Sequence, residues 1–197
     1  MRFEIPLSEE ILLHSTQLND CLFLTGELKI DIATVLVQDL MKLEARNRAN
    51  NEFNPITLLI NCPGGDLYSA WMIIDWMNQM VTPIETFALG QAASAGLMIF
   101  MNGTQGLRKA TKNTQFMSHR YSIGIEASHA DLMAQRKELD RTHDRIINHY
   151  MKCTKLTKKI IQDQLLTEHN VWLDAKQCKK FNICDVVTVD FFKTKGK

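Results

Sequence analysis

Short apolar runs alternate along this chain with longer amphipathic stretches. The runs CLFLT (21–25), ITLLIN (56–61) and ETFAL (85–89) have the length of strands, and the last two are apolar enough to be buried on both faces of a sheet. The stretches between these runs carry apolar residues at helical spacing, which predicts helices over about 31–49 and 67–80. Strands that alternate with helices favour an α/β fold with a mainly parallel sheet.

Helical spacing also predicts which side chains of these two helices face the core. In the first helix, which Asp31 can cap, they are Ile32, Val35, Leu36, Leu40 and Leu43, and in the second they are Leu67, Trp71, Ile74 and Met77. Ahead of the first strand, residues 8–14 (SEEILLH) fit a short helix or loop that Ser8 can cap.

The second half of the chain continues the alternation. The segment GQAASAG (90–96) interrupts the preceding strand and opens a short apolar helix that ends at Met101. LRKAT (107–111) and TQFMSH (114–119) are the next expected strands. A long amphipathic helix is expected over about 128–152, followed by helices near 157–166 and 174–181 and a strand near Val186. The inward residues of the long helix are Leu132, Leu139, Ile146, Ile147 and Tyr150.

The composition narrows the function classes without choosing one. The 197 residues suit a single domain, and a content of 45% hydrophobic and 23% charged residues is typical of a soluble globular protein. The net charge of +1 gives no bulk argument for binding nucleic acid or an anionic membrane surface. No apolar run approaches the length of a membrane span, and the first ten residues lack the pattern of a signal peptide. The five cysteines form no CxxC pair, which favours free thiols in a reducing compartment, the cytoplasm, over a disulfide scaffold or a zinc site.

Two glycine-containing breaks fall at the carboxyl ends of expected parallel strands, where α/β proteins place their sites. One is the pair Gly64-Gly65, and the other is the turn around Ser94. A serine that opens a helix presents its hydroxyl beside free backbone N–H groups and the positive end of the helix dipole. Ser94 is therefore a candidate nucleophile, with the N–H groups of Ala95 and Gly65 as candidate oxyanion donors. The competing interpretation is structural, because small residues let elements pack closely and a Gly-Gly pair is often only a turn.

A nucleophilic serine needs a base, and histidine is the natural choice. Of the six histidines, only His119 ends an expected buried strand in the α/β core. His129, His143 and His149 lie on the long helix and are expected to be surface or packing residues. The third group, which would accept the other imidazole N–H, is not selected by spacing. Its candidates are Asp66, Asp131, Asp163, Asn170 and Asp174.

Five ordered motifs resemble the ClpP family, the proteolytic subunits of ATP-dependent Clp proteases, over about residues 20–187. LFLTGEL (22–28) is similar to the family's IFLTGEV, and LLINCPGGDLYSAWMIIDWM (58–77) is similar to its YINSPGG segment and the helix that follows. ALGQAASAGLMIFMNGTQGLR (88–108) resembles GxAASMGxxLLxAGxxGxR, and FMSHRY (116–121) takes the place of MIHQP. LTEHNVWLDAKQCKKFNICDVV (166–187) resembles TERDxFMSAxEAxxYGLID. Five motifs in order and at compatible spacing are far more specific than any one of them.

The resemblance implies a role for each matching position. The positions are Ser94 (nucleophile), His119 (general base), Gly65 and Ala95 (oxyanion donors) and Asn170 (third member of the triad). Most of the family has aspartate where this chain has Asn170. An amide can accept the imidazole N–H but carries no charge to stabilise the imidazolium, and in another serine protease the same exchange lowers turnover about 10⁴-fold. Asp163 and Asp174 are the acids that could substitute for it.

Other departures from the family pattern surround these positions. His169 replaces the arginine that helps to join two rings in the family, and Tyr121 replaces a proline. Residues 120–152 are expected to form the family's handle, with a strand over 120–127 followed by the long helix. Residues 1–19 are expected to form a short axial region.

The resemblance implies a single ClpP-like domain over residues 1–197, with the crotonase-type α/β fold and a protruding handle. It implies a serine endopeptidase that hydrolyses unfolded polypeptides inside a seven-membered ring, with two such rings stacked into a tetradecamer. The chain has no Walker-A segment, so a separate AAA+ unfoldase of the ClpX, ClpA or ClpC type would supply the ATP-driven unfolding. No cofactor, metal ion, nucleic acid or membrane is expected as a partner.

Two alternatives stay open. One is a catalytically weak or inactive ring subunit that needs a second ClpP-type subunit; Asn170 and His169 favour it, and the intact Ser94, His119 and Gly65 disfavour it. The other is a crotonase-type acyl-CoA enzyme, which would share the fold but use its oxyanion hole on thioesters. The serine and histidine at family spacing disfavour this second alternative.

Overall fold

The computed structural model describes residues 20–122 and 128–188. In chain order the elements are β1 (Cys21–Thr25), α2 (Ile30–Asn50), β2 (Ile56–Cys62), α3 (Leu67–Gln79), β3 (Ile84–Ala93), α4 (Ala95–Met101), β4 (Arg108–Thr111), β5 (Gln115–Ser118), α5 (His129–Thr154), α6 (Lys158–Gln164), β6 (Val171–Asp174), α7 (Ala175–Lys180) and β7 (Val186–Thr188). The expected axial region (1–19), the segment 8–14 within it and residues 123–127 of the expected handle strand lie outside the described residues.

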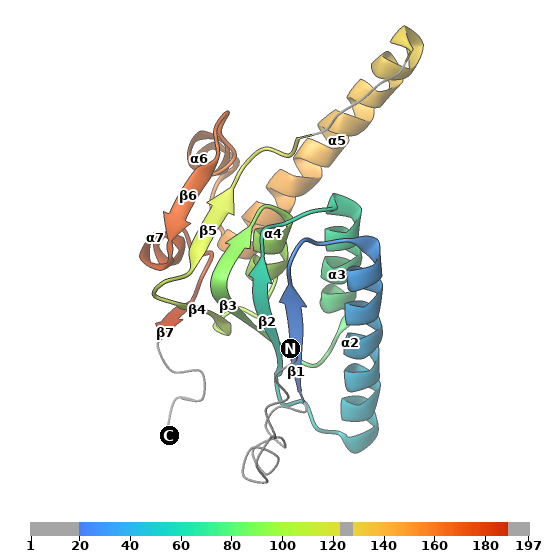
Figure 1. Cartoon of the computed structure of the whole chain (residues 1–197), viewed down its shortest axis with the longest axis vertical. Coiled ribbons are helices and arrows are strands. Elements are labelled where there is room, and N and C mark those ends of the chain that lie inside the picture. The colour runs from blue at the N-terminus through green and yellow to red at the C-terminus, as the bar shows by residue number, and fades with distance from the viewer. Residues whose placement is uncertain (1–19, 123–127, 189–197) are drawn as a thin grey trace, which may run out of the picture.

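A mainly parallel sheet forms the centre of the molecule, which confirms the expected α/β class. The strands β1, β2, β3, β4 and β7 pair in that order, and each neighbouring pair is parallel. The helices α2 and α3 lie side by side against the sheet, while α5 runs obliquely and its first turns project beyond the rest of the molecule (Figure 1). None of the helices in the described part of the chain is both long enough and apolar enough to cross a membrane.

The strand β3 is longer than its apolar run and has two different partners. Residues 86–88 pair with β4, whereas residues 91–93 pair with β5, so the break expected at the start of GQAASAG is wrong. Gly90 has a φ of 74° between these two halves, and a Cβ there would lie 3.0 Å from Asn61 Oδ1. The same Asn61 oxygen accepts the Gln91 N–H at 3.3 Å. This bend directs the end of β3, and Ser94 after it, toward β5.

The strand β6 was not expected from the sequence. It pairs with β5 in antiparallel register, from Gln115 opposite Asp174 to Ser118 opposite Val171. Only Leu173 of this four-residue strand is buried, and its short apolar run from Val171 to Leu173 is not long enough to mark a strand by itself. Pairing with β5 therefore defines β6, and it sets the position of the loop that precedes it.

Two expected core positions, Val35 and Leu132, are exposed. Val35 of α2 is 58% exposed although its neighbours Ala33 and Leu36 are buried, so it lies on the solvent side of the helix. Leu36 and Leu40 of the same helix are buried as expected. Leu132 of α5 is 43% exposed, since it lies on the turns that project from the molecule. The second half of α5 is buried as expected, through Ile146, Ile147 and Tyr150.

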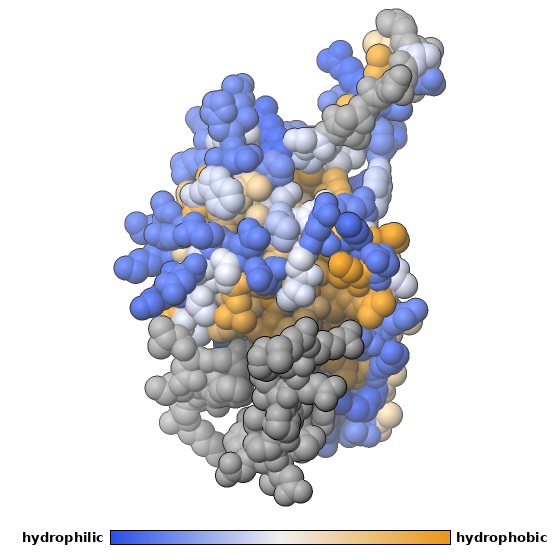
Figure 2. Space-filling view, viewed as in Figure 1, coloured by the Kyte–Doolittle hydropathy of each residue, from blue (hydrophilic) through white to orange (hydrophobic). Residues whose placement is uncertain are grey.

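The face of the sheet away from α2 and α3 is less covered than the sequence predicts. In β2 the side chains of Leu58 and Ile60 are fully buried, whereas Leu59 is only half-buried, so burial on both faces holds only in part. Phe23 of β1 is 61% exposed and Leu89 of β3 is 37% exposed. Figure 2 shows a gathering of apolar side chains near the centre of this view, among largely hydrophilic surroundings. Exposed apolar side chains that gather in this way are typical of interaction surfaces.

Candidate active site

Ser94 stands at the junction of β3 and α4. Its φ of 53° and ψ of −121° lie outside the regions that non-glycine residues favour, so the chain turns sharply at this residue. Its N–H donates to the Met117 carbonyl of β5 at 2.8 Å, which fixes the turn to the neighbouring strand. The small neighbours are a packing requirement, since a Cβ at Gly64 would lie 2.7 Å from the Ser94 Cβ, and one at Gly96 would lie 2.8 Å from a backbone oxygen of β2. The turn thus presents the Ser94 hydroxyl at the carboxyl edge of the sheet.

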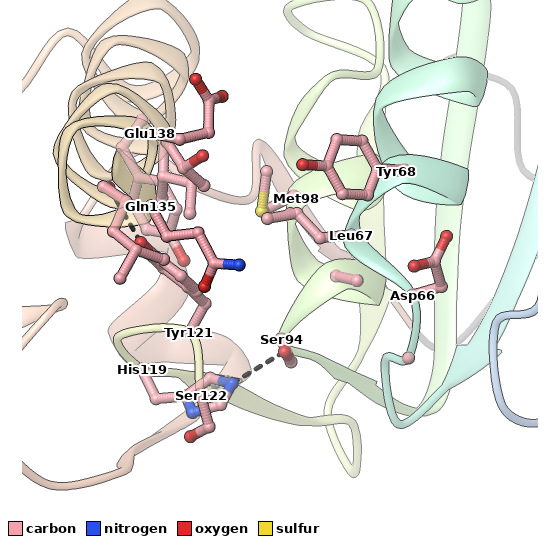
Figure 3. A pocket seen from close by; sticks show the side chains of 16 residues that line it. Asp66, Leu67, Tyr68, Ser94, Met98, His119, Tyr121, Ser122, Gln135 and Glu138 are labelled. Carbon is pink, nitrogen blue, oxygen red and sulfur yellow. Dashed lines mark hydrogen bonds between the residues drawn. The ribbon is translucent and has the colours of Figure 1, made fainter. Parts of the chain in front are cut away.

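His119 follows β5 directly and lies against Ser94. Its Nε2 is 2.7 Å from the Ser94 Oγ (Figure 3). The contact follows from the pairing of β5 with the end of β3, where Ala93 is the partner of Met117. Burial lowers the pKa of His119 below its ordinary value, which favours the neutral imidazole. A neutral Nε2 is the form that can accept the serine proton.

Asn170 and His119 each lie one residue beyond the last pair of β5 and β6, and no hydrogen bond joins them. Ser118 pairs with Val171, so the register of β5 and β6, continued by one residue, places Asn170 opposite His119. Residues opposite each other in an antiparallel pair have Cβ atoms about 4.5–5.5 Å apart. The Asn170 side chain is exposed, and among the described residues no hydrogen bond joins it to the imidazole. The continued register thus puts residue 170 on the same side of β5 as the base, and the amide and the imidazole are not bonded to each other.

The other acids considered for the third position do not contact His119. Asp66 caps α3 and accepts the backbone N–H and the hydroxyl of Ser69, both at 2.7 Å. Asp131 bonds within the first turn of α5, and Asp174 forms a capping box at the start of α7. Asp163 is exposed on α6. In residues 20–122 and 128–188, these carboxylates either bond to groups at the start of a helix or are exposed to solvent.

Gly65 and Ala95, the candidate oxyanion donors, line the same cleft as Ser94. Gly65 forms an isolated parallel bridge with Leu28, whose N–H and carbonyl bond to the residues on either side of Gly65 at 2.7 and 2.9 Å. Because groups on successive residues of extended chain point to opposite sides, the N–H of Gly65 itself points away from Leu28. A Cβ at Gly65 would lie 2.2 Å from the Leu28 oxygen, so only glycine fits there. The N–H of Ala95 opens α4, where backbone donors have no partner within the helix.

A cleft of about 750 Å³ opens above Ser94 and His119. Its lining residues are Gly65, Asp66, Leu67, Tyr68, Ser94, Ala95, Met98, His119, Tyr121, Ser122, Gln135, Glu138, Leu139, Thr142, Ile146 and Tyr150. Side chains of α3 form one wall and side chains of α5 form the other (Figure 3). The deepest members, Met98, Ile146 and Tyr150, are almost fully buried. In the described part of the chain, no three histidine, cysteine or acidic side chains gather as a metal site would require.

Three further hydrogen bonds hold the segment that carries His119, and no pattern along the chain predicts them. The pairs are Ser118 Oγ with Tyr150 OH (2.9 Å), Arg120 Nε with the Leu166 carbonyl (2.8 Å) and Tyr121 OH with the Leu139 carbonyl (2.8 Å). Each joins residues that are 18 or more positions apart, so no local pattern could reveal it.

Comparison with known proteins agrees with this geometry. The proteolytic subunit of the ATP-dependent Clp protease of Deinococcus radiodurans is 29% identical over 177 residues, which cover 89% of this chain and 83% of that protein. A solved structure of an asparagine-to-aspartate mutant of ClpP1 from Listeria monocytogenes matches 90% of this chain and 96% of its own, with a TM-score of 0.78 at 22% identity. That match confirms the expected ClpP-like fold. The family model described as Clp protease matches residues 10–190. The chain, with its serine and histidine at the edge of this sheet, therefore belongs to the Clp protease family as a divergent ClpP member.

Proposed function

We propose that this chain is a serine endopeptidase subunit of a Clp-type protease. The observation that carries the proposal is the 2.7 Å contact between Ser94 Oγ and the Nε2 of a partly buried His119, at a strained strand-to-helix turn. In the proposed reaction, His119 takes the Ser94 proton while the oxygen attacks a peptide carbonyl. The N–H groups of Gly65 and Ala95 stabilise the oxyanion. His119 then protonates the leaving amine, and water hydrolyses the acyl-enzyme by the same steps.

The shape of the cleft supports an unfolded polypeptide as the substrate. Its two walls, from α3 and α5, face each other across the cleft that contains Ser94 (Figure 3). A cleft of this kind suits an extended chain, and its buried apolar floor at Met98 and Ile146 suits an apolar side chain. A folded protein would have to be opened first, which supports dependence on a separate AAA+ unfoldase.

We propose the family's assembly for this chain as well. Residues 1–197 would form one ClpP-like domain, with residues 120–152 as the handle, and seven copies would form a ring that stacks on a second ring. The projecting turns of α5 support this, because Leu132 and Met133 are 43% and 55% exposed and would gain burial against another subunit. Phe23, at 61% exposed, is a further apolar side chain that a neighbour would cover.

The experiment that tests the serine assignment is covalent labelling with a fluorophosphonate, read by intact mass. We expect one adduct on the wild-type protein and none on Ser94→Ala, together with loss of hydrolysis of an unfolded protein or a fluorogenic peptide. The Ser94→Ala protein should assemble as the wild type does, since its side chain supports the reaction rather than the fold. Undiminished hydrolysis by Ser94→Ala would show that Ser94 is not the nucleophile.

A second candidate function follows from Asn170. The amide is exposed and unbonded to His119, which favours a ring subunit of low intrinsic activity that depends on a second ClpP-type subunit. Absence of labelling in a protein shown to be folded and assembled, followed by labelling or hydrolysis after a partner subunit is added, would place this candidate first.

A further inference from the structure

The chain that leaves β5 is held by side-chain bonds to two other parts of the molecule. Beyond Ser118, the last paired residue of β5, Arg120 bonds to the loop after α6 and Tyr121 bonds to α5. His119 lies between Ser118 and Arg120 and contacts Ser94. The position of the imidazole therefore depends on side-chain bonds as well as on the pairing of the sheet.

Tyr121 makes the bond nearest to the projecting part of α5. Its hydroxyl donates to the Leu139 carbonyl at 2.8 Å. Leu139 is half-buried; α5 is exposed before it and buried after it, at Ile146 and Ile147. The bond thus joins the segment of His119 to α5 at the point where the helix leaves the core.

The environment of Tyr121 favours this bond. Its ring is half-buried and packs against the hydrophobic core. Burial, with a smaller effect of the Asp140 carboxylate, raises the pKa of Tyr121, so its hydroxyl stays protonated and able to donate. The donor is therefore present across the pH range in which a neutral histidine can act as a base.

We propose that Tyr121 is a positioning residue: its bond to the Leu139 carbonyl ties the segment of His119 to α5 and holds the imidazole against Ser94. The inference rests on the proposed function, and it adds a link between the placement of α5 and the competence of the base. Loss of the hydroxyl should loosen His119 without removing any group that reacts. A hydrogen bond of ordinary strength corresponds to about a fivefold change in the population of the aligned state.

The test compares Tyr121→Phe with wild type and with a control, Thr34→Val. Thr34 donates a hydroxyl bond of the same type, to the Ile30 carbonyl of α2 at 2.7 Å, away from the cleft. Hydrolysis of a fluorogenic peptide gives kcat and KM for each protein. The rate at which diethyl pyrocarbonate acylates His119, followed by peptide mass mapping, reports how firmly the imidazole is held even if no hydrolysis occurs. His143, half-buried on α5, is the internal reference for that rate.

For Tyr121→Phe we expect kcat to fall about fivefold with KM unchanged, and the acylation rate of His119 to rise about fivefold. The rate at His143 and all values for Thr34→Val should match wild type. A higher KM with unchanged kcat would show that Tyr121 contacts substrate instead, and an unchanged acylation rate of His119 would show that the bond does not hold the base. Either result overturns the inference. If wild type neither hydrolyses peptide nor takes up the fluorophosphonate, the proposed function fails, and the acylation rates still decide the role of Tyr121.

Discussion

Replacing Asn170 with aspartate would supply the charge that the base lacks. The register of β5 and β6 places residue 170 opposite His119, so a carboxylate there would lie within reach of the imidazole. The substitution changes one atom of the side chain and keeps its size. It should therefore leave the fold intact and alter only the electrostatics of the base.

The size of the effect follows from the exposure of the position. Two unit charges about 4 Å apart attract by about 4 kcal/mol at an effective dielectric constant near 20, but exposed pairs are worth about 1 kcal/mol or less after screening. The Asn170 side chain is exposed, so the lower value applies. About 1 kcal/mol of stabilisation for the imidazolium corresponds to a rise in the pKa of His119 of somewhat less than one unit. We therefore expect the turnover of Asn170→Asp to rise about fivefold, far below the factor of about 10⁴ for a buried carboxylate.

Steady-state hydrolysis across pH tests this expectation. The carboxylate favours protonated His119, so the acid limb of the profile of kcat/KM should move to higher pH while the plateau rises. Asn113→Asp is a matched control, because Asn113 is exposed in the turn before β5, at the end of that strand away from His119. An Asn170→Asp protein that assembles normally but shows the plateau and acid limb of wild type would refute the placement of residue 170 beside the base.

Two further substitutions test the oxyanion donor and the packing of α2. Gly65→Ala should lower kcat at least about 100-fold, because its Cβ would lie 2.2 Å from the Leu28 oxygen and displace the N–H that we assign to the oxyanion. Gly106→Ala, which has a φ of 90° but no atom within 4 Å of the added Cβ, is its control for backbone strain, and equal activity of the two variants would contradict the assignment. Glu44→Gln should lower the free energy of unfolding at pH 7 by about 2 kcal/mol, since the carboxylate accepts two backbone N–H groups after α3 and the Arg48 guanidinium. Burial would raise the pKa of Glu44, but these bonds lower it to about 2, so this stabilisation is complete above the unfolded value of 4.5 and is lost as the pH falls toward about 2. Denaturant unfolding of wild type and Glu44→Gln should show their difference in free energy of unfolding narrowing over that pH range. A difference that stays constant with pH would contradict the role of the charge.

Most of the fold could be predicted because its strands are short apolar runs and its long helices carry apolar residues at helical spacing. The strands β1 and β2 and the helices α2, α3 and α5 were expected close to their observed bounds, whereas β3 continues past its expected end at residue 89 to Ala93. The failures occurred where burial depends on distant parts of the chain. Periodicity placed Val35 and Leu132 in the core, but Val35 lies on the solvent side of α2 beside the buried Leu36, and Leu132 lies on turns of α5 that project beyond the core. The strand β6 was missed because only pairing with β5 identifies it.

The candidate site was predictable in its residues but not in its contacts. The order of the motifs pointed to Ser94 and His119, and the structure places their reactive atoms 2.7 Å apart. The residue pattern left five candidates for the third position; Asn170 directly precedes the strand that pairs with β5, whereas no hydrogen bond joins any of the five to His119 among the described residues. The bonds of Arg120 and Tyr121 could not be predicted, because each joins residues far apart in the chain. Arginine and tyrosine side chains can also bond to many kinds of partner, so the residue type does not indicate which one is used.

These contacts have a common consequence for how the base is oriented. In a complete serine triad, one buried carboxylate both fixes the imidazole and stabilises its charge. Here the Asn170 amide makes no bond to His119 in the described residues, and fixation falls to Arg120 and Tyr121, which follow His119 and bond to the α6–β6 loop and to α5. Neither of these bonds reaches the imidazole, so neither can stabilise the imidazolium as a carboxylate does. Orientation and charge stabilisation are therefore separable in this chain: Tyr121→Phe should disturb the first, and Asn170→Asp should add the second. Because one substitution changes the orientation of the imidazole and the other changes the stabilisation of its charge, their effects on kcat should multiply in the double variant. If both substitutions acted through the same property of His119, the effect of each would depend on whether the other was present.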